Sequence, residues 1–225
     1  MNEITKKIHV FFDTFPLVSY KKDEIILRPD DLTLYVYYVV FGFVRMYCLL
    51  PDGKELTLNI FKPGSYFPMF LILGDSMNTY YYQTITPVKI ERAPKAEVLA
   101  FLRRESDVLF EFTTRISVGL NGLLSNIQYL LFGSASSRVA SVLLILARRF
   151  GEVKSATTTI TLPLTHQDIA NLIGLTRETT SLEMEKLVAK KIISYDHKQV
   201  TIHSARVLAQ AVLLEEVANV DDVSL

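Results

Sequence analysis

The sequence predicts an α+β protein that begins with an antiparallel β-barrel of the jelly-roll type, continues with a long helix and ends with a winged helix-turn-helix. Three observations support this order. Short apolar segments separated by turn residues follow one another over 24–91, as in antiparallel barrels. After Pro94, apolar residues recur every three or four positions, which is the period of a helix. Residues 162–203 combine two helix caps, a glycine turn and a hairpin pattern.

The composition is that of a globular chain with room for two domains. Its 225 residues are 49% hydrophobic, which is enough for a sizeable core. Cys48 is the single cysteine, so the chain forms no internal disulfide and cannot ligate a four-cysteine iron-sulfur cluster. One cysteine fits a reducing cytoplasm, and residues 1–15 lack the apolar core and cleavage site of a secretory signal. We therefore expect a cytoplasmic location.

The most apolar segment, residues 32–50, favours strands over a membrane span. A span needs about 20 apolar residues, but this segment contains Gly42 and Arg45 and is rich in Val and Tyr, which prefer strands. It predicts two strands joined by a turn near Phe41 and Gly42, and no membrane association. The other turns of the β-region are expected at Asp30-Asp31, Pro51-Asp52-Gly53, Lys62-Pro63-Gly64, Gly74-Asp75-Ser76 and Thr86-Pro87.

The long helix is predicted over 107–133 and carries an apolar seam about three heptads long. The residues of this seam are Leu109, Phe112, Ile116, Leu120, Leu123, Ile127 and Leu130. Such a stripe packs either onto its own barrel or against a second copy of the helix, and its length favours a partner helix. A Gly-Ser-Ala-Ser-Ser segment from Gly133 then breaks the helix. The predicted parts are therefore an N-terminal β-domain over 1–106, a dimerisation helix over 107–133 and a winged helix-turn-helix domain over 134–225.

The helix-turn-helix is predicted from its caps. Thr165 and Asp168 form a capping-box pattern that satisfies backbone donors at the start of a helix. Gly174 permits the left-handed conformation that ends this helix, and Thr176 caps the next one. The buried side of the second helix is expected to hold Thr180, Met184, Leu187 and Val188. Strands over 192–195 and 200–203 around a polar turn predict a hairpin, the wing.

This local pattern alone is shared by many helical hairpins that bind no DNA. The net charge of zero adds nothing in favour of nucleic acid, although residues 134–206 hold ten Lys and Arg against six Asp and Glu. DNA binding is favoured because the second helix begins with Arg177, Glu178 and Thr179 and is followed by the wing. Duplex DNA is therefore the expected partner.

At this point the chain resembles the Crp/Fnr family of bacterial transcription regulators, in which a (Ser/Thr)-Arg-Glu-Thr segment opens the recognition helix. Here that segment runs Thr176-Arg177-Glu178-Thr179-Thr180-Ser181. The segments 42–47, 51–55 and 63–67 are similar to the family's cyclic-nucleotide-binding-like barrel. The resemblance implies a parallel homodimer through the long helix, two recognition helices about one DNA turn apart, and RNA polymerase as a further partner.

The expected DNA contacts divide into base and phosphate contacts. The expected base contacts are Arg177, Glu178, Ser181 and Leu182. Arg can present a fork to guanine, and Glu can accept from cytosine. Leu182 replaces the Arg that the family commonly has there, and this puts the family's usual half-site in doubt. The expected phosphate contacts are Thr165, His166, Gln167, Thr176, Thr179 and Lys198.

Residues 1–106, which the resemblance implies are the effector domain, depart from the cyclic-AMP-binding relatives. Pro68-Met69 stands where the resemblance implies a Gly-Glu pair for the ribose, and Asn78-Thr79 near the Arg-Ser pair for the phosphate. No Arg or Lys lies between Lys62 and Lys89, although a buried phosphate needs a cation. We therefore expect a regulator that cyclic AMP does not control, with an unknown effector or none. The candidate effector pocket is Phe67, Met69, Asn78, Thr79, Tyr81, Leu123 and Leu124.

The aromatic residues of this region leave two interpretations open. They either line a pocket for an apolar or aromatic ligand or simply pack the core, and packing is the commoner role of aromatics at strand spacing. Haem and metal sites are not predicted, because His9 is the only histidine before the DNA-binding region. Two further functions rank behind DNA binding. One is a small-molecule-binding module with a protein-binding C-terminal domain, and the other, ranked last, is an enzyme, for which no catalytic set is found.

Overall fold

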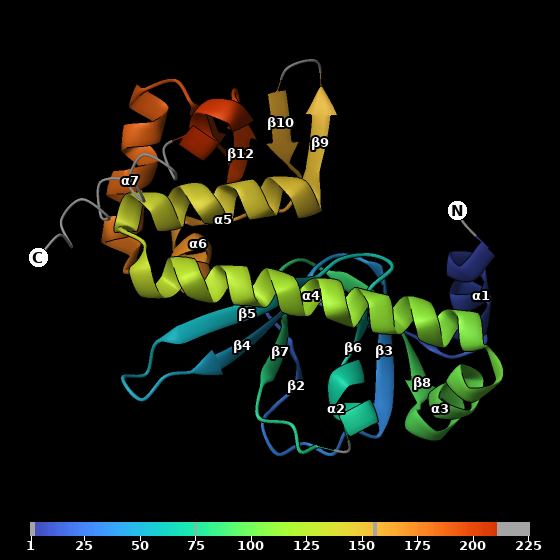
Figure 1. Cartoon of the computed structure of the whole chain (residues 1–225). Coiled ribbons are helices and arrows are strands. Elements are labelled where there is room, and N and C mark those ends of the chain that lie inside the picture. Colours follow the sequence, from blue (N-terminus) through green and yellow to red (C-terminus); the bar gives the residue numbers. More distant parts are fainter. Residues whose placement is uncertain (1–2, 75, 155–156, 211–225) are drawn as a thin grey trace, which may run out of the picture. The chain divides into compact units, whose positions relative to one another are not determined.

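The computed structural model describes residues 3–74, 76–154 and 157–210, and within the long helix it leaves out the side chains of 121, 125–126 and 128–132. The chain folds into two compact units, Met1–Asn121 and Gly122–Leu225 (Figure 1). Within the described residues, no helix is long and apolar enough to cross a membrane. The strands predicted within 32–50 are present, with the turn at Gly42.

The first unit is a jelly roll of two four-stranded antiparallel sheets. Its strands are β1 (Leu17–Tyr20), β2 (Ile25–Leu27), β3 (Tyr35–Phe41), β4 (Val44–Leu49), β5 (Glu55–Phe61), β6 (Tyr66–Phe67), β7 (Tyr81–Thr84) and β8 (Val88–Pro94). One sheet has the order β1-β8-β3-β6 and the other β2-β7-β4-β5. This double-sheet arrangement confirms the predicted jelly-roll type. The prediction of a β-barrel implied one closed sheet. The two sheets instead stay separate and do not close into a single barrel.

Strand β3 shows how the unit is layered. Its residues alternate between two cores, because successive side chains of a strand point to opposite faces. Tyr37 and Val39 belong to the core between the two sheets, whereas Val36 and Tyr38 belong to the core under the helices. The turn after β3 requires Gly42, whose φ is +86° and whose added Cβ would lie 2.2 Å from the Pro87 carbonyl oxygen. Burial on both faces therefore makes β3 the centre of the unit.

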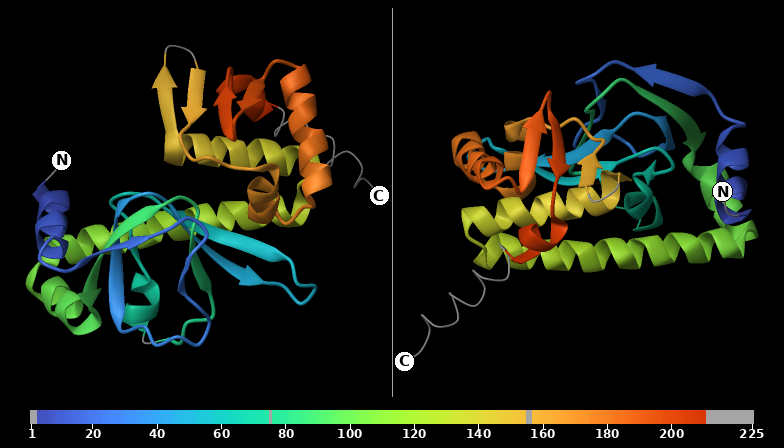
Figure 2. Two further views of the ribbon diagram at one scale, coloured as in Figure 1. Left: turned by 180° about the vertical axis from the view of Figure 1, so that it is seen from behind. Right: turned by 90° about the horizontal axis from the view of Figure 1, so that it is seen from above.

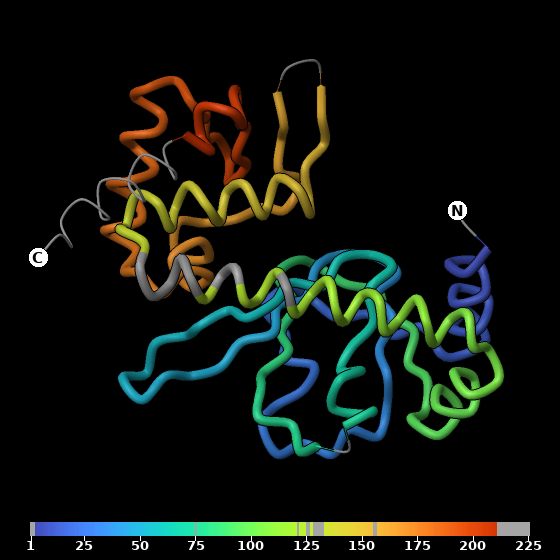
Figure 3. Tube along the Cα trace, viewed as in Figure 1, coloured from blue at the N-terminus to red at the C-terminus, as the bar shows by residue number. Residues whose placement is uncertain are grey.

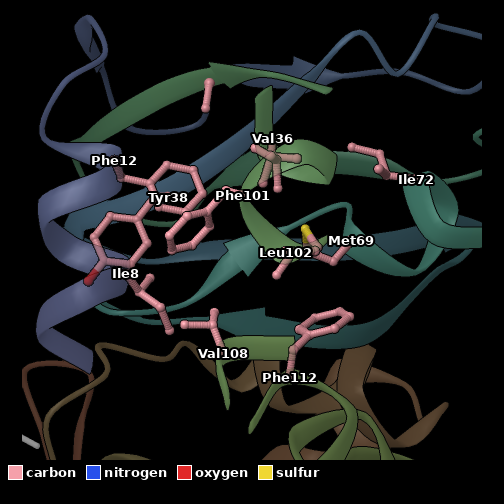
Figure 4. Packing of buried hydrophobic residues seen from close by; sticks show 12 residues of the cluster. Ile8, Phe12, Val36, Tyr38, Met69, Ile72, Phe101, Leu102, Val108 and Phe112 are labelled. Carbon is pink, nitrogen blue, oxygen red and sulfur yellow. The ribbon is translucent and has the colours of Figure 1, made fainter. Parts of the chain in front are cut away.

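Helices cover the outer face of the β1-β8-β3-β6 sheet. They are α1 (Glu3–Phe12), α2 (Met69–Gly74), α3 (Lys95–Arg104) and the first turns of α4 (Ser106–Phe132). Figure 4 shows their apolar side chains meeting Val36 and Tyr38 of β3. A cavity of about 20 Å³ remains there, lined by apolar side chains and Tyr66. A space of that size holds about one water molecule, so it is not a ligand pocket as it stands.

The long helix α4 has a buried start and an exposed apolar stripe. Val108 and Phe112 are 2% and 4% exposed and pack with the core under the helices. Phe112 therefore does not belong to the predicted dimer seam, because its own unit covers it. The exposed members of the seam are Leu109, Ile116, Leu120, Leu123 and Ile127. The side chain of Leu130 lies outside the described residues.

The second unit contains a cluster of three helices and a four-stranded sheet. Figure 2 shows this unit from two sides. Its elements are α5 (Ala135–Phe150), β9 (Gly151–Lys154), β10 (Thr157–Ile160), α6 (His166–Ile173), α7 (Arg177–Ala189), β11 (Ile193–Asp196) and β12 (Gln199–Ile202). Helix α5 packs against α6 and α7. The sheet has the order β11-β12-β10-β9. The predicted helix pair and wing are both present, and the hairpin β9–β10 extends the wing into a larger sheet.

Candidate nucleic-acid interface

Helix α6 begins with the capping box that the sequence predicts. The hydroxyl oxygen of Thr165 accepts from the Asp168 backbone N–H at 3.1 Å, and the Asp168 carboxylate accepts from the Thr165 N–H at 2.8 Å. The helix ends at Gly174, which has a left-handed φ of 63° and donates its N–H to the Ala170 carbonyl. These groups fix the ends of α6 and so the angle at which the chain enters α7.

Helix α7 starts at Arg177, directly after the turn. Thr176 caps it, because the Thr176 hydroxyl oxygen accepts from the Thr179 backbone N–H at 3.2 Å. The first turn contains Arg177 and Glu178, and both are exposed. Leu182, one turn further along, is 59% exposed. The start of this helix therefore presents a cation, a carboxylate and an apolar group to solvent.

The opposite side of α7 holds it in the unit. Thr180, Met184 and Leu187 are 0%, 1% and 6% exposed. Val188 is 41% exposed, so its prediction as a buried residue is wrong. Three and four residue spacing places Thr180, Met184 and Leu187 on one side, whereas Val188 lies at the edge of that side. Packing at three positions fixes the orientation of the opposite, exposed side of α7, which we call the recognition face.

His166 and Ser181, predicted for phosphate and base contact respectively, are bonded to each other. The Nδ1 atom of His166 lies 2.7 Å from the Ser181 hydroxyl oxygen. The imidazole also packs on Tyr195 of the wing, with ring centroids 4.7 Å apart. Burial lowers the pKa of His166, and the neighbouring Arg177 cation lowers it further. His166 is therefore a neutral internal link between α6, α7 and β11, which sequence periodicity gave no means to detect.

The other predicted phosphate contacts divide into occupied and exposed groups. The Thr165 hydroxyl lies 2.6 Å from an Asp168 carboxylate oxygen and so is held within the cap. Gln167 is exposed, and its amide nitrogen donates to the Asn171 side chain at 2.7 Å. The hydroxyls of Thr176 and Thr179 lie 3.0 Å apart at the exposed start of α7. Gln167, Thr176 and Thr179 are the members of this group available to a backbone phosphate.

The wing places Lys198 at its tip. His197 and Lys198 have φ values of 47° and 66°, the positive values that a two-residue type I′ hairpin turn requires. The Lys198 carbonyl accepts from the Leu164 N–H at 2.8 Å, and the Tyr195 hydroxyl donates to the Leu164 carbonyl at 2.9 Å. The wing is thus tied to the residue that precedes the α6 cap, while the Lys198 side chain is exposed.

The jelly roll is filled with aromatic rings where a barrel ligand would need space. We call Tyr37, Phe61, Phe67 and Tyr82 the interior ring cluster. Phe67 and Tyr82 stack with centroids 5.0 Å apart, and Tyr37 stacks on Phe67 at 5.3 Å. Phe61 lies 4.9 Å from Phe67. Phe67 and Tyr82 are fully buried.

The predicted effector residues of the first unit do not converge on one pocket. Phe67 lies in the interior ring cluster, whereas Met69 packs in the other core, under the helices. Asn78 is buried, and its amide donates to the Arg28 and Tyr80 carbonyls at 2.6 and 2.8 Å, which locks a loop. Thr79 is exposed, and Tyr81 stacks on Tyr47 at 5.0 Å.

The two remaining candidate effector residues belong to the second unit. Leu123 and Leu124 are 43% and 54% exposed. Figure 3 follows the trace of α4, the helix that carries them. The five residues of the first unit serve packing and loop structure instead of lining one site. A single pocket formed by all seven residues stays a prediction.

The chain is similar to known regulators over most of its length. A model of the Crp-like helix-turn-helix domain matches residues 137–211, and a model of the cyclic nucleotide-binding domain matches residues 17–105. The global nitrogen regulator of Nostoc sp. strain PCC 7120 is 30% identical over 200 residues, which cover 87% of this chain and 90% of that protein. The nitrogen fixation regulation protein FixK of Bradyrhizobium diazoefficiens is 29% identical, with 86% and 81% covered.

A solved structure agrees with these sequence matches. FixK2 from Bradyrhizobium japonicum shares 25% identity and a TM-score of 0.75, with 88% of this chain and 97% of that chain covered. The capped helix pair, the exposed start of α7 and the wing define a winged helix-turn-helix transcription regulator that binds DNA. The chain belongs to the Crp/Fnr family. Its relatives are regulators and not enzymes, so the enzyme hypothesis is set aside.

Proposed function

We propose that this regulator binds a palindromic operator as a homodimer, with the start of α7 from each protomer in the major groove. The observation that carries this proposal is the exposed pair Arg177 and Glu178 at the first turn of a capped helix. A guanidinium can donate to O6 and N7 of guanine, and a carboxylate can accept from the amino group of cytosine. Ser181 supplies a third base contact, and Leu182 can touch a thymine methyl group.

We assign the phosphate contacts to the polar groups around this helix that reach solvent. Gln167, Thr176 and the wing residue Lys198 are exposed, and Thr179 is half-buried. Thr165 and His166 are left out, because the structure uses their side chains for the α6 cap and the Ser181 contact. Phosphate contacts set position and affinity, whereas base contacts set sequence preference. The two sets therefore have different expected mutant phenotypes.

The dimer contact is assigned to the exposed stripe of α4. Leu109, Ile116 and Leu120 are 38%, 41% and 55% exposed, and their spacing continues to Leu123 and Ile127. Intervals of seven, four and three residues place these side chains on one side of a helix. Burial of each side chain by a partner helix contributes about 1.5–3 kcal/mol at most. A parallel pair of α4 helices would present two α7 helices to two half-sites.

The proposed switch does not use cyclic AMP. A buried phosphate requires a cation and converging donors, and residues 63–88 contain no Arg or Lys. The interior ring cluster fills the space between the sheets, and the amide of Asn78 is already bonded to backbone carbonyls. These observations support regulation by another signal, or DNA binding without an effector. The family also makes RNA polymerase the expected protein partner and the cytoplasm the expected location.

Selection of bound duplexes from a random library tests the proposal. The expected result is enrichment of a palindrome whose half-site centres lie about 10 base pairs apart. The affinity should fall steeply with salt, because phosphate contacts release counterions. Sedimentation of the complex should give two protomers per duplex. Binding without enrichment of any sequence, or one protomer per duplex at saturation, would overturn the proposal.

A further inference from the structure

The imidazole of His166 is held by three elements of the second unit. His166 is the first residue of α6. Its Nδ1 atom is 2.7 Å from the Ser181 hydroxyl oxygen on α7, and its ring centroid lies 4.7 Å from that of Tyr195 on β11. Tyr195 is itself fixed, because its hydroxyl donates to the Leu164 carbonyl at 2.9 Å. A side chain placed this firmly can control the hydroxyl that it touches.

Ser181 occupies the edge of the recognition face. It is half-buried, between the buried Thr180 and the exposed Leu182. A serine within a helix often bonds back to the carbonyl four residues earlier, which here would be that of Arg177. In the described part of the chain, the hydroxyl of Ser181 instead makes its hydrogen bond with His166. His166 therefore decides where the Ser181 proton points.

The environment of His166 selects one arrangement of protons. Its Nε2 atom is buried and has no hydrogen-bond partner among the described residues. A neutral imidazole carries one N–H and one acceptor nitrogen. A buried N–H without a partner is rarer in proteins than a buried acceptor without a partner. Nε2 is therefore the acceptor, and the proton belongs on Nδ1. The Nδ1–H group then donates to the Ser181 oxygen and leaves the Ser181 O–H free to donate elsewhere.

We propose that His166 is a positioning residue that fixes Ser181 as a hydrogen-bond donor toward the major groove. The base that Ser181 faces must then offer an acceptor on its major-groove edge, such as O4 of thymine or N7 of a purine. Cytosine offers an amino donor there and is selected against. This inference rests on the proposed base contact of Ser181. It adds a specificity determinant that itself touches no base.

The test compares variants of the full-length protein on the palindrome obtained by selection, with each base changed symmetrically in both half-sites. Ser181→Ala should flatten the preference at one position by about three- to tenfold, the value of one hydrogen bond. His166→Phe should flatten the same position, and the double variant should lose no more than either single variant. His166→Asn should retain the preference, because its amide N–H can replace the Nδ1–H group.

The outcomes separate the inference from the base contact beneath it. If Ser181→Ala loses the preference and His166→Phe keeps it, the positioning role is wrong and the base contact stands. If Ser181→Ala changes no position, the base contact of Ser181 fails and the inference fails with it. His166→Gln serves as a second variant if His166→Phe does not fold, because its amide corresponds to Nε2 and the same loss is expected. Thermal unfolding of each variant checks its fold.

Discussion

The rings of Phe67 and Tyr82 stack between the two sheets of the jelly roll, with centroids 5.0 Å apart and planes 9° apart. Both residues are fully buried, and burial raises the pKa of the Tyr82 hydroxyl above its usual range. A pair of rings in this position fills the interior and adds aromatic contact energy to the burial of apolar area. The interior of this unit is therefore a packed core.

Removal of the Phe67 ring should destabilise the jelly roll. Phe67→Ala is expected to lower the free energy of unfolding by about 3–5 kcal/mol, the usual cost of losing a fully buried phenyl ring. Tyr81→Ala is the matched control, since its half-buried ring lies on β7 and points to the face opposite that of its neighbour Tyr82. Urea unfolding followed by circular dichroism measures both. Equal losses for the two variants would mean that the interior ring cluster is not the central support.

Cyclic AMP should leave the protein unchanged. A ligand at a hundred times its dissociation constant adds about 2.7 kcal/mol to stability, so specific binding is visible as a rise in the unfolding temperature. We expect no rise at millimolar cyclic AMP and no change in affinity for the operator, since residues 63–88 supply no cation for the phosphate. A saturable rise in the unfolding temperature would show that the nucleotide binds.

One added charge tests whether the exposed stripe of α4 forms the dimer contact. Leu120→Lys should shift the protein toward the monomer, because a lysine on the apolar side of α4 loses its hydration when two helices meet. Val118 is 68% exposed and lies away from the stripe, so Val118→Lys is the matched control and should leave the dimer intact. Sedimentation velocity over a range of concentrations measures the difference. A dimer that survives Leu120→Lys would place the contact elsewhere.

The stability of the second unit should depend on pH through His166. Burial and Arg177 lower the pKa of His166 below its ordinary value of 6.5. The unfolded chain then binds more protons than the folded chain as the pH falls below 6.5, so stability is present above that value and is lost toward acid. His166→Asn should reduce this loss. Hydrogen exchange of the β11 and β12 amides at pH 7.5 and 5.5 measures it.

His197 provides the control for this titration. Its pKa is raised by the hydrogen bond to Asp196, so its contribution has the opposite sign and is lost as the pH rises. Both groups are exposed at the wing tip, and screening by water keeps the effect small. His197→Asn should therefore leave the loss toward acid in place. An unchanged loss in His166→Asn would assign it to another group.

Local patterns allowed much of the fold to be predicted from the sequence. Thr165, Asp168 and Gly174 fix the helix ends through bonds within a few residues, and such bonds are visible as spacing. The wing turn at His197 and Lys198 follows from its polar tip between apolar strands. The alternation of β3 likewise follows from a period of two. These elements needed no knowledge of the tertiary structure.

The features that could not be predicted from the sequence depend on contacts between residues far apart in the chain. Phe112 fits the heptad seam by its spacing, but the rotation of α4 against its own unit buries it. His166 carries the features of a phosphate contact, and only the approach of α7 and β11 turns it inward. Phe67 and Met69 are two residues apart and belong to different cores. Periodicity reports which side of an element is apolar and not which neighbour covers it.

Comparison of Arg177→Ala with Lys198→Ala is the most direct test that α7 determines the DNA sequence bound. Operator variants with every base changed in turn are titrated with each protein at several salt concentrations. Arg177→Ala should cost about 1–3 kcal/mol and relax one base position in each half-site, whereas Lys198→Ala should weaken all sequences alike and reduce the salt slope by about one. A uniform loss across all sequences for Arg177→Ala would contradict the account.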